Sequence, residues 1–161
     1  MIKVLDQIDS AMLLTEYLKL EEKIVWTEMG HKGKQTGLQF KEGEDPWTSA
    51  VGRSTGNELA CSVINPYFTG TIFEELINQY KFKRTRLMWV SPYACYSMHK
   101  DETQRVHIPI ITNLDCYFIF KNKAPVHLKI NNIYQTDTRL THTFMNCSDE
   151  HRLHLVGAVQ T

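Results

Sequence analysis

The sequence is most informative from residue 97 to 110, which reads Ser97-Met-His-Lys-Asp-Glu-Thr-Gln-Arg-Val-His-Ile-Pro-Ile110. Ionisable residues recur two positions apart in it, first as His99 and Asp101 and then as Arg105 and His107. In an extended chain, residues i and i+2 point to the same face. The spacing therefore predicts extended chain whose ionisable side chains converge in pairs.

The residues around this segment predict a β-rich C-terminal half. From Arg84 onward the chain contains short runs rich in β-branched and aromatic residues, separated by turn formers at roughly regular spacing. We expect strands at residues 87–90, 106–112, 116–120, 126–130 and 153–156. Many short strands of this kind are typical of a sandwich or a barrel.

The N-terminal half has a different pattern. Apolar residues recur at three-to-four spacing over residues 6–22, without Pro or Gly, which predicts an amphipathic helix. Turn formers at 31–37 and 41–46 predict loops around one short strand at 38–40.

A second helix is expected to begin at Thr71, because Thr71 and Glu74 have the spacing of a capping box and an apolar face follows them. We expect both helices to pack on the β-core. No linker divides the chain, so we predict one domain over 1–161, with a catalytic β-core at about 85–158 and helical and loop support from 1–84.

Composition limits the partners. The 161 residues carry 18 basic and 18 acidic side chains, so no overall field favours nucleic acid or an anionic membrane, and a small-molecule partner is expected. The four cysteines form no CxxC pair, which indicates free thiols in a reducing, cytoplasmic compartment. No apolar run approaches the roughly 20 residues of a membrane span. The oligomeric state is left open.

The pair His99 and Asp101 supplies two of the three side chains in a two-histidine, one-carboxylate metal site, and His142 is the candidate for the third. Arg152 follows His142 by ten residues, and turn formers lie between them. We expect a hairpin that holds His142 and Arg152 a few ångströms apart.

The chemistry of such a site explains the arginine. Two imidazoles and one carboxylate leave adjacent positions on Fe(II) open for a bidentate 2-oxo acid and O2. The far carboxylate of the oxo acid needs a fixed partner, and a guanidinium grips a carboxylate through two parallel hydrogen bonds. Arg152 suits that task better than a lysine would.

The order His99-x-Asp101, Arg105-x-His107, His142 and Arg152 resembles the aspartyl/asparaginyl β-hydroxylase-like branch of the 2-oxoglutarate oxygenases, which includes enzymes similar to proline cis-hydroxylases. The resemblance covers roughly residues 85–158. It implies a mainly β fold, a cupin-like jelly roll or double-stranded β-helix with N-terminal and flanking α-helices. It also implies an Fe(II) dioxygenase that uses O2 and releases succinate and CO2 from 2-oxoglutarate.

The resemblance also implies roles for single residues. His99, Asp101 and His142 are the expected metal ligands and catalytic centre, and Arg152 is expected to bind the distal carboxylate of 2-oxoglutarate. Arg105 and His107 are expected near the proximal carboxylate of the oxo acid, and the hydroxyl of Tyr96, just before this segment, is a further candidate contact to the co-substrate.

Other interpretations remain open at this point. The presence of Asp101 favours hydroxylation of a free amino acid or a small polar molecule, whereas some family members that modify Asp or Asn within proteins lack that carboxylate. The alternatives are a hydroxylase of Asp, Asn or Pro side chains in a protein or peptide, a cupin-type metal enzyme that does not use 2-oxoglutarate, and a non-catalytic binding module. His107 and His154 each alternate with apolar neighbours, a pattern that is equally typical of core imidazoles.

Overall fold

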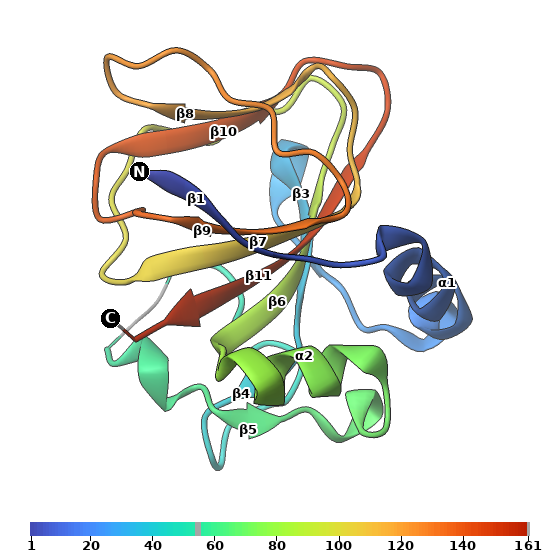
Figure 1. Ribbon diagram of the computed structural model, residues 1–161. Helices are drawn as coiled ribbons and strands as arrows, with labels where there is room; N and C mark the ends of the chain where they lie inside the picture. Colours follow the sequence, from blue (N-terminus) through green and yellow to red (C-terminus); the bar gives the residue numbers. More distant parts are fainter. Residues whose placement is uncertain (54–55, 161) are drawn as a thin grey trace.

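Two antiparallel sheets face each other in the computed structural model, which describes residues 1–53 and 56–160 (Figure 1). The strands are β1 (Ile2–Gln7), β2 (Thr27–Glu28), β3 (Gly33–Gly37), β4 (Gln39–Phe40), β5 (Val63–Ile64), β6 (Lys83–Val90), β7 (Gln104–Ile111), β8 (Cys116–Phe120), β9 (Asn132–Thr136), β10 (His142–Asn146) and β11 (Arg152–Val159). The α-helices are α1 (Ser10–Leu20) and α2 (Ile72–Tyr80). This confirms the mainly β fold with flanking helices.

The large sheet has seven strands in the order β1-β9-β7-β11-β6-β3-β2, and every neighbouring pair is antiparallel. Strand β11 lies at its centre, paired with β6 on one side and β7 on the other. Because side chains alternate between the faces of a strand, each of these strands presents one row of residues to the helices and one row to the small sheet.

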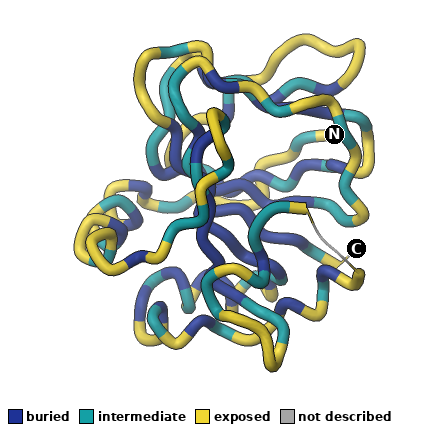
Figure 2. The backbone as a smooth tube through the Cα atoms, turned by 180° about the vertical axis from the view of Figure 1, so that it is seen from behind, coloured by how far each residue is buried: buried dark blue, intermediate teal, exposed yellow. Residues whose placement is uncertain are grey.

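The outer row is apolar and packs under the helices. Leu87 of β6, Ile108 of β7 and Leu155 of β11 join Leu13 of α1 and Phe73 of α2 in one buried cluster. Figure 2 shows the buried backbone running through the middle of the molecule, with exposed residues along the loops and one side of the helices. Burial of this face is what attaches both helices to the sheet.

The inner row faces the small sheet, in which β8 pairs with β10. Phe118 of β8 and Phe144 of β10 pack against Met88 and Val156 of the large sheet in a second buried cluster. Residues 95–99 lie along the free side of β10, through isolated bridges from Cys95 to Met145 and from His99 to His142. The segment before β7 is therefore part of the small sheet.

The helix predicted at 6–22 is confirmed from Ser10 onward, but residues 2–7 before it form strand β1. The Asp9 side chain accepts a hydrogen bond from the backbone N–H of Ala11 and so caps the helix. The helix predicted from Thr71 is confirmed at Ile72–Tyr80, without the expected capping box. The hydroxyl of Thr71 donates to the carbonyl oxygen of Phe68, and the carboxylate of Glu74 accepts from the N–H of Gly70.

The loop predicted at 31–37 is wrong, because Gly33–Gly37 is strand β3 of the large sheet. Its glycines stand where another backbone segment approaches the strand closely, and they do not form turns. A Cβ on Gly33, whose φ is +129°, would lie 1.9 Å from the carbonyl oxygen of Trp89 on β6. With β1 also in the large sheet, the N-terminal half supplies strands as well as helices.

Most of the strands predicted in the C-terminal half are confirmed, and 116–120 has the predicted bounds. The run 126–130 is not a strand, since within it only Val126 forms a bridge, to Phe118. The paired strand is the next segment, β9, which joins β1 to β7. Local residue preference could not separate the two neighbouring runs.

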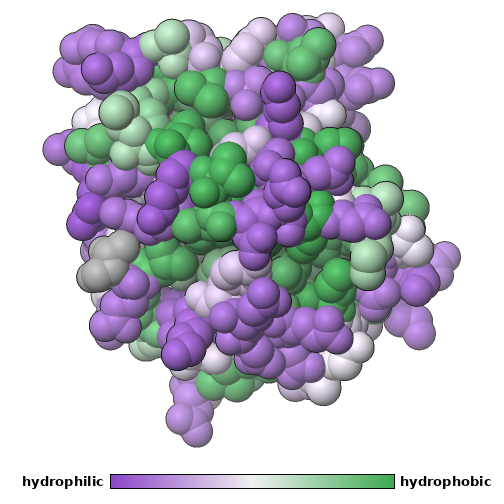
Figure 3. Space-filling model, viewed as in Figure 1, coloured by the Kyte–Doolittle hydropathy of each residue, from purple (hydrophilic) through white to green (hydrophobic). Residues whose placement is uncertain are grey.

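The surface and the cysteines agree with the composition. Hydrophilic residues are interspersed with smaller hydrophobic groups on the face seen in Figure 3. All four cysteines are free thiols. Among the described residues, neither helix has the length and apolar character needed to span a bilayer.

Candidate metal centre

His99 and His142 lie opposite each other on neighbouring extended segments. Their backbones exchange two hydrogen bonds, each 2.9 Å long, from N–H of His99 to O of His142 and the reverse. Asp101 is fixed two residues later, where its N–H donates to the carbonyl oxygen of Thr138 at 2.9 Å. Side chains that are 43 positions apart in sequence are thereby placed at one point by backbone pairing.

The three side chains converge. One ligand atom from each of His99, Asp101 and His142 lies within 4.8 Å of the others. The Nε2 atom of His99 is 4.0 Å from Oδ1 of Asp101, and the Nε2 atom of His142 is 3.7 Å from Oδ2. The sequence prediction that these residues meet is confirmed.

Backbone carbonyls fix which ring nitrogen faces the centre. Nδ1 of His99 is 2.7 Å from the carbonyl oxygen of Ser97, and Nδ1 of His142 is 2.9 Å from that of Leu140. A carbonyl only accepts hydrogen bonds, so in each neutral ring Nδ1 carries the proton and Nε2 keeps its lone pair. Both lone pairs are then directed toward Asp101, which is the donor set a divalent transition metal requires.

The surroundings of His142 hold it in this form. Its ring is buried and stacks on Phe118, with centroids 5.2 Å apart and an interplanar angle of 4°. Burial lowers the pKa of His142, and the nearby His99 acts in the same direction against the raising effects of the Leu140 carbonyl and Asp101. The ring is therefore neutral at neutral pH, as metal binding requires.

The triad lies in the wall of a cavity of about 570 Å³ between the two sheets. Its lining is more basic than the chain as a whole, with six basic and three acidic side chains. The basic residues are Lys32, Arg53, Arg84, Arg86, Lys100 and Arg105, and the acidic residues are Glu58, Asp101 and Glu102. This imbalance favours an anionic ligand.

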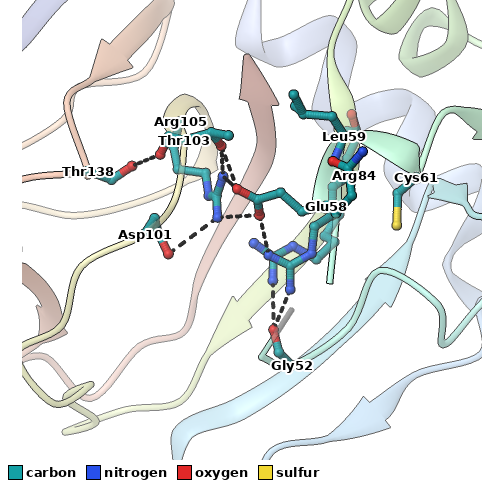
Figure 4. A network of polar contacts seen from close by, with 12 residues as sticks. Gly52, Glu58, Leu59, Cys61, Arg84, Asp101, Thr103, Arg105 and Thr138 are labelled. Carbon is teal, nitrogen blue, oxygen red and sulfur yellow. Dashed lines mark hydrogen bonds and ion pairs between the residues drawn. The ribbon is translucent and has the colours of Figure 1, made fainter. Parts of the chain in front are cut away.

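One buried carboxylate, Glu58, joins two of these arginines (Figure 4). Its Oε2 atom accepts hydrogen bonds from Nη1 of Arg84 at 2.9 Å and from Nη2 of Arg105 at 2.7 Å. Its Oε1 atom accepts from Nη1 of Arg105 at 2.9 Å and from the hydroxyl of Thr103 at 2.7 Å. Burial alone would raise the pKa of Glu58, but the hydrogen bonds and charge of Arg105, with Thr103 and Arg84, lower it to about 2. Arg105 also lies 3.3 Å from Oδ1 of Asp101, so the network reaches the triad.

The other predicted site residues differ in how closely they approach the cavity. Arg105, His107 and Tyr96 line it. Arg105 is already engaged by Glu58, the buried His107 has an Nδ1 atom without a partner among the described residues, and the Tyr96 hydroxyl accepts from Nε2 of Gln35 at 3.3 Å. Of these three, His107 is thus the residue with a buried hydrogen-bonding atom that has no described partner.

Arg152 is buried but is not part of the described cavity lining. The predicted hairpin is wrong, because β10 pairs with β8 and β11 pairs with β6 and β7. The guanidinium of Arg152 instead crosses the sandwich and lies 5.0 Å from the ring centroid of Phe144, which shares a face of β10 with His142.

The contacts of Arg152 leave it without a counter-ion. Its Nε donates to Nε2 of His154 at 3.0 Å, and none of the described carboxylates pairs with it. Burial lowers the pKa of Arg152 to about 10, against opposing effects of Cys116 and Tyr96, so it remains protonated at neutral pH. Burial and the charge of Arg152 lower the pKa of His154, which keeps that imidazole neutral and able to accept.

Sequence reasoning missed Glu58, Arg84, Arg86 and Gln35, all from outside the C-terminal motif. A signal existed for the two arginines, which stand two apart at the start of an otherwise apolar strand, Arg84-Thr-Arg-Leu-Met-Trp-Val90. No comparable pattern surrounds Glu58, which lies in a short 3₁₀ turn, Glu58–Ala60. Its role depends on contacts that are distant in sequence.

Comparisons with known proteins agree with this geometry. The family model for aspartyl/asparaginyl β-hydroxylases matches residues 11–160. No curated protein matches the chain.

Two solved structures are similar in fold. The first is a 2OG-Fe(II) oxygenase family oxidoreductase from Burkholderia pseudomallei, with a TM-score of 0.61 and 13% identity over 90% of this chain and 76% of that chain. The second is a prolyl-4-hydroxylase from Pseudomonas putida, with a TM-score of 0.55 and 11% identity over 98% of this chain and 90% of that chain. Together with the two facing sheets, they show the jelly-roll fold of the double-stranded β-helix kind.

Proposed function

Since the chain belongs to the aspartyl/asparaginyl β-hydroxylase family, we propose that it is an Fe(II)- and 2-oxoglutarate-dependent dioxygenase with His99, Asp101 and His142 as metal ligands. The observation that carries the proposal is the convergence of two imidazole Nε2 lone pairs on one carboxylate, with both Nδ1 protons held by backbone carbonyls. A zinc hydrolase site would use similar ligands, but it gives no role to a buried arginine without a counter-ion.

The residues of the chain fit the needs of iron and the oxo acid. Bound iron would supply oxygen activation, coupled to the conversion of 2-oxoglutarate to succinate and CO2. Arg152 would hold the distal carboxylate of the oxo acid, since its guanidinium is buried, charged and free of any described acidic partner. Of the two residues expected near the proximal carboxylate, Arg105 and His107, His107 has a buried hydrogen-bonding atom without a described partner, and Tyr96 also lines the cavity.

Arg105 has a different local role from the one its sequence position suggests. Its guanidinium is held by Glu58 and lies 3.3 Å from Asp101. We propose that it orients the Asp101 carboxylate toward the metal, because a ligand held by an outer hydrogen bond is fixed in direction and charge.

The test of the metal and co-substrate assignment is spectroscopic. Anaerobic addition of Fe(II) and then 2-oxoglutarate should produce a weak visible charge-transfer band in the wild type and not in Asp101→Ala, because that variant loses the only anionic ligand. Asp137→Ala is the control, since Asp137 pairs with Arg139 at the surface. A wild-type band in Asp101→Ala, with matched melting curves, would remove Asp101 from the site.

We propose a small polar molecule, such as a free amino acid, as the prime substrate. The support is the basic cavity and the branch of the family that the Asp101 ligand resembles. Free amino acids should include at least one that raises succinate release above the uncoupled rate. If none does, while a peptide or protein fraction gives a hydroxylated product, the enzyme modifies protein side chains instead.

A further inference from the structure

We propose that Arg86 is the anchor for a carboxylate of the prime substrate, separate from the residues that hold 2-oxoglutarate. The proposal rests on the function given above and adds the substrate's chemical class, a small carboxylic acid. Arg86 was not singled out by the sequence, and it lies on β6 with its side chain in the cavity lining.

The first observation is the unequal pairing of the three buried arginines in the cavity. Arg84 and Arg105 both bind the carboxylate of Glu58. Arg86 has no described carboxylate partner, and its Nε atom is buried without any hydrogen-bond partner among the described residues. A buried charge without a counter-ion is costly unless something in its surroundings compensates it.

The neutral contacts of Arg86 hold it in place without neutralising it. Its Nη1 donates to Oε1 of Gln35 at 3.2 Å and to the carbonyl oxygen of Gly52 at 3.4 Å. Gln35 is fixed in turn, because its Oε1 also accepts from the N–H of Gly52 at 3.2 Å and its Nε2 donates to Tyr96. A held guanidinium with unused donors is suited to bind a carboxylate.

The second observation is the distance between Arg86 and Arg152. Across β11, Arg86 pairs with Val156 and Arg152 pairs with Val90, so the two arginines are four strand positions apart. Four positions correspond to roughly 13 Å along the sheet. An oxo acid whose far carboxylate is held by Arg152 would have its other carboxylate at the metal ligands, which leaves Arg86 for a second anion.

The third observation is charge. The cavity lining has six basic and three acidic side chains, whereas the whole chain carries no net charge. The two positive charges of Fe(II) would be balanced by the two negative charges of the oxo acid. The excess positive charge of the lining side chains is then left for the prime substrate to balance. Arg86 is the most enclosed member of that excess, since Lys32, Arg53 and Lys100 are not buried.

The experiment compares acids with their amides. The anaerobic protein is loaded with Fe(II) and 2-oxoglutarate, the charge-transfer band is recorded, and the free proteinogenic amino acids and their C-terminal amides are titrated by calorimetry. We expect at least one acid to bind roughly 10- to 100-fold more tightly than its amide, as for loss of a charged hydrogen-bonded pair. Arg86→Met should remove that preference and leave 2-oxoglutarate affinity unchanged.

Two further variants make the result specific. Arg86→Lys keeps the charge and should retain an intermediate preference for the acid, which separates loss of the site from loss of the fold. Arg139→Met removes one positive charge from an exposed ion pair and should behave as the wild type.

The proposal is overturned if acids and amides bind equally, or if none of them binds. If the charge-transfer band still forms in that case, the dioxygenase assignment stands. Weaker 2-oxoglutarate binding in Arg86→Met, with acid preference kept, also overturns the proposal, because Arg86 would then serve the co-substrate. If the wild-type protein shows no charge-transfer band, the proposed dioxygenase function is wrong, and this inference is wrong with it.

Discussion

At the scale of single residues, Glu58 has the most connections of any carboxylate near the candidate site. It pairs with both Arg84 and Arg105 and receives a hydrogen bond from Thr103, all in a buried position. Arg105 extends the network to Asp101, so the N-terminal half of the chain is connected to the proposed metal ligands through one side chain. Glu58 therefore supports the fold and, through Arg105, contacts the proposed metal site.

We predict that Glu58→Gln destabilises the protein by about 3 to 5 kcal/mol, because it leaves the buried Arg84 without a carboxylate partner and Arg105 with Asp101 alone. Glu16→Gln, which breaks an exposed pair with Lys19, should cost less than about 1 kcal/mol. Urea unfolding of both variants measures the difference. Equal midpoints for the two would show that the Glu58 network does not contribute to stability.

The same residue predicts a pH dependence. Since the pKa of Glu58 is lowered from 4.5 to about 2 in the folded protein, its contribution is present above pH 4.5 and is lost as pH falls toward 2. The wild type should therefore lose more stability than Glu58→Gln over this interval, as measured by urea unfolding at several pH values. Parallel losses in the two proteins would contradict the assignment.

Arg152 gives a prediction about the co-substrate. Arg152→Lys should weaken 2-oxoglutarate roughly tenfold or more while leaving Fe(II) affinity nearly unchanged, because a point charge does not reproduce a bidentate grip. Titration of each ligand into the anaerobic protein measures the two affinities. Unchanged 2-oxoglutarate affinity would mean that the distal carboxylate is held elsewhere.

At the scale of elements, β3 carries Gln35 into the cavity and depends on a glycine to do so. Gly33 pairs with Val90 at the end of β6, and a Cβ at Gly33 would overlap the carbonyl of Trp89. The strand can approach β6 only without a side chain at this position. The site therefore depends on a residue whose pattern in sequence is typical of a loop.

We predict that Gly33→Ala costs roughly 3 kcal/mol or more, through backbone strain and loss of β3 pairing. Gly30→Ala is the matched control, because Gly30 also has a positive φ, +63°, but has nothing within 4 Å of its Cβ position. That control should cost about 1 to 2 kcal/mol. Thermal unfolding and hydrogen exchange at β3 distinguish them, and similar effects of the two variants would exclude the close approach as the cause.

At the scale of the whole molecule, the three proposed ligands bind two parts of the fold together. His142 and His99 pair with each other in the small sheet, and Asp101 lies on the segment that leads from there into β7 of the large sheet. A metal bound by all three would link them. Since the unfolded chain does not hold the ligands together, binding should add to the stability of the folded state.

We predict that Mn(II), added as a redox-stable substitute for Fe(II), raises the melting temperature of chelator-treated protein. At a concentration of 100 times the Kd the gain is about 2.7 kcal/mol, or roughly 5 to 10 °C for a chain of this size. His99→Ala, which truncates a half-exposed ligand, should show little shift. The same shift in that variant would mean that the metal binds elsewhere.

The sequence alone determined the features that depend on local periodicity and residue order. A run of aromatic and β-branched residues predicted β8 with its observed bounds, an apolar face predicted α2, and the order of His99, Asp101 and His142 predicted the triad that the fold brings together. These features are encoded locally, because a strand or helix assigns its own side chains to faces. The proposed ligands were predictable, since a metal restricts which residue types can serve.

The tertiary structure alone decided which segments pair and which charges meet. The predicted hairpin of β10 and β11 is replaced by pairing in separate sheets. Glu58 meets Arg84 and Arg105 across 26 and 47 residues of sequence. Strand partners and buried ion pairs depend on which surfaces remain to be covered once the sheets pack, and local pattern carries no information about that choice. Arg86 is therefore recognised as an unpaired cation only when the whole cavity is assembled around it.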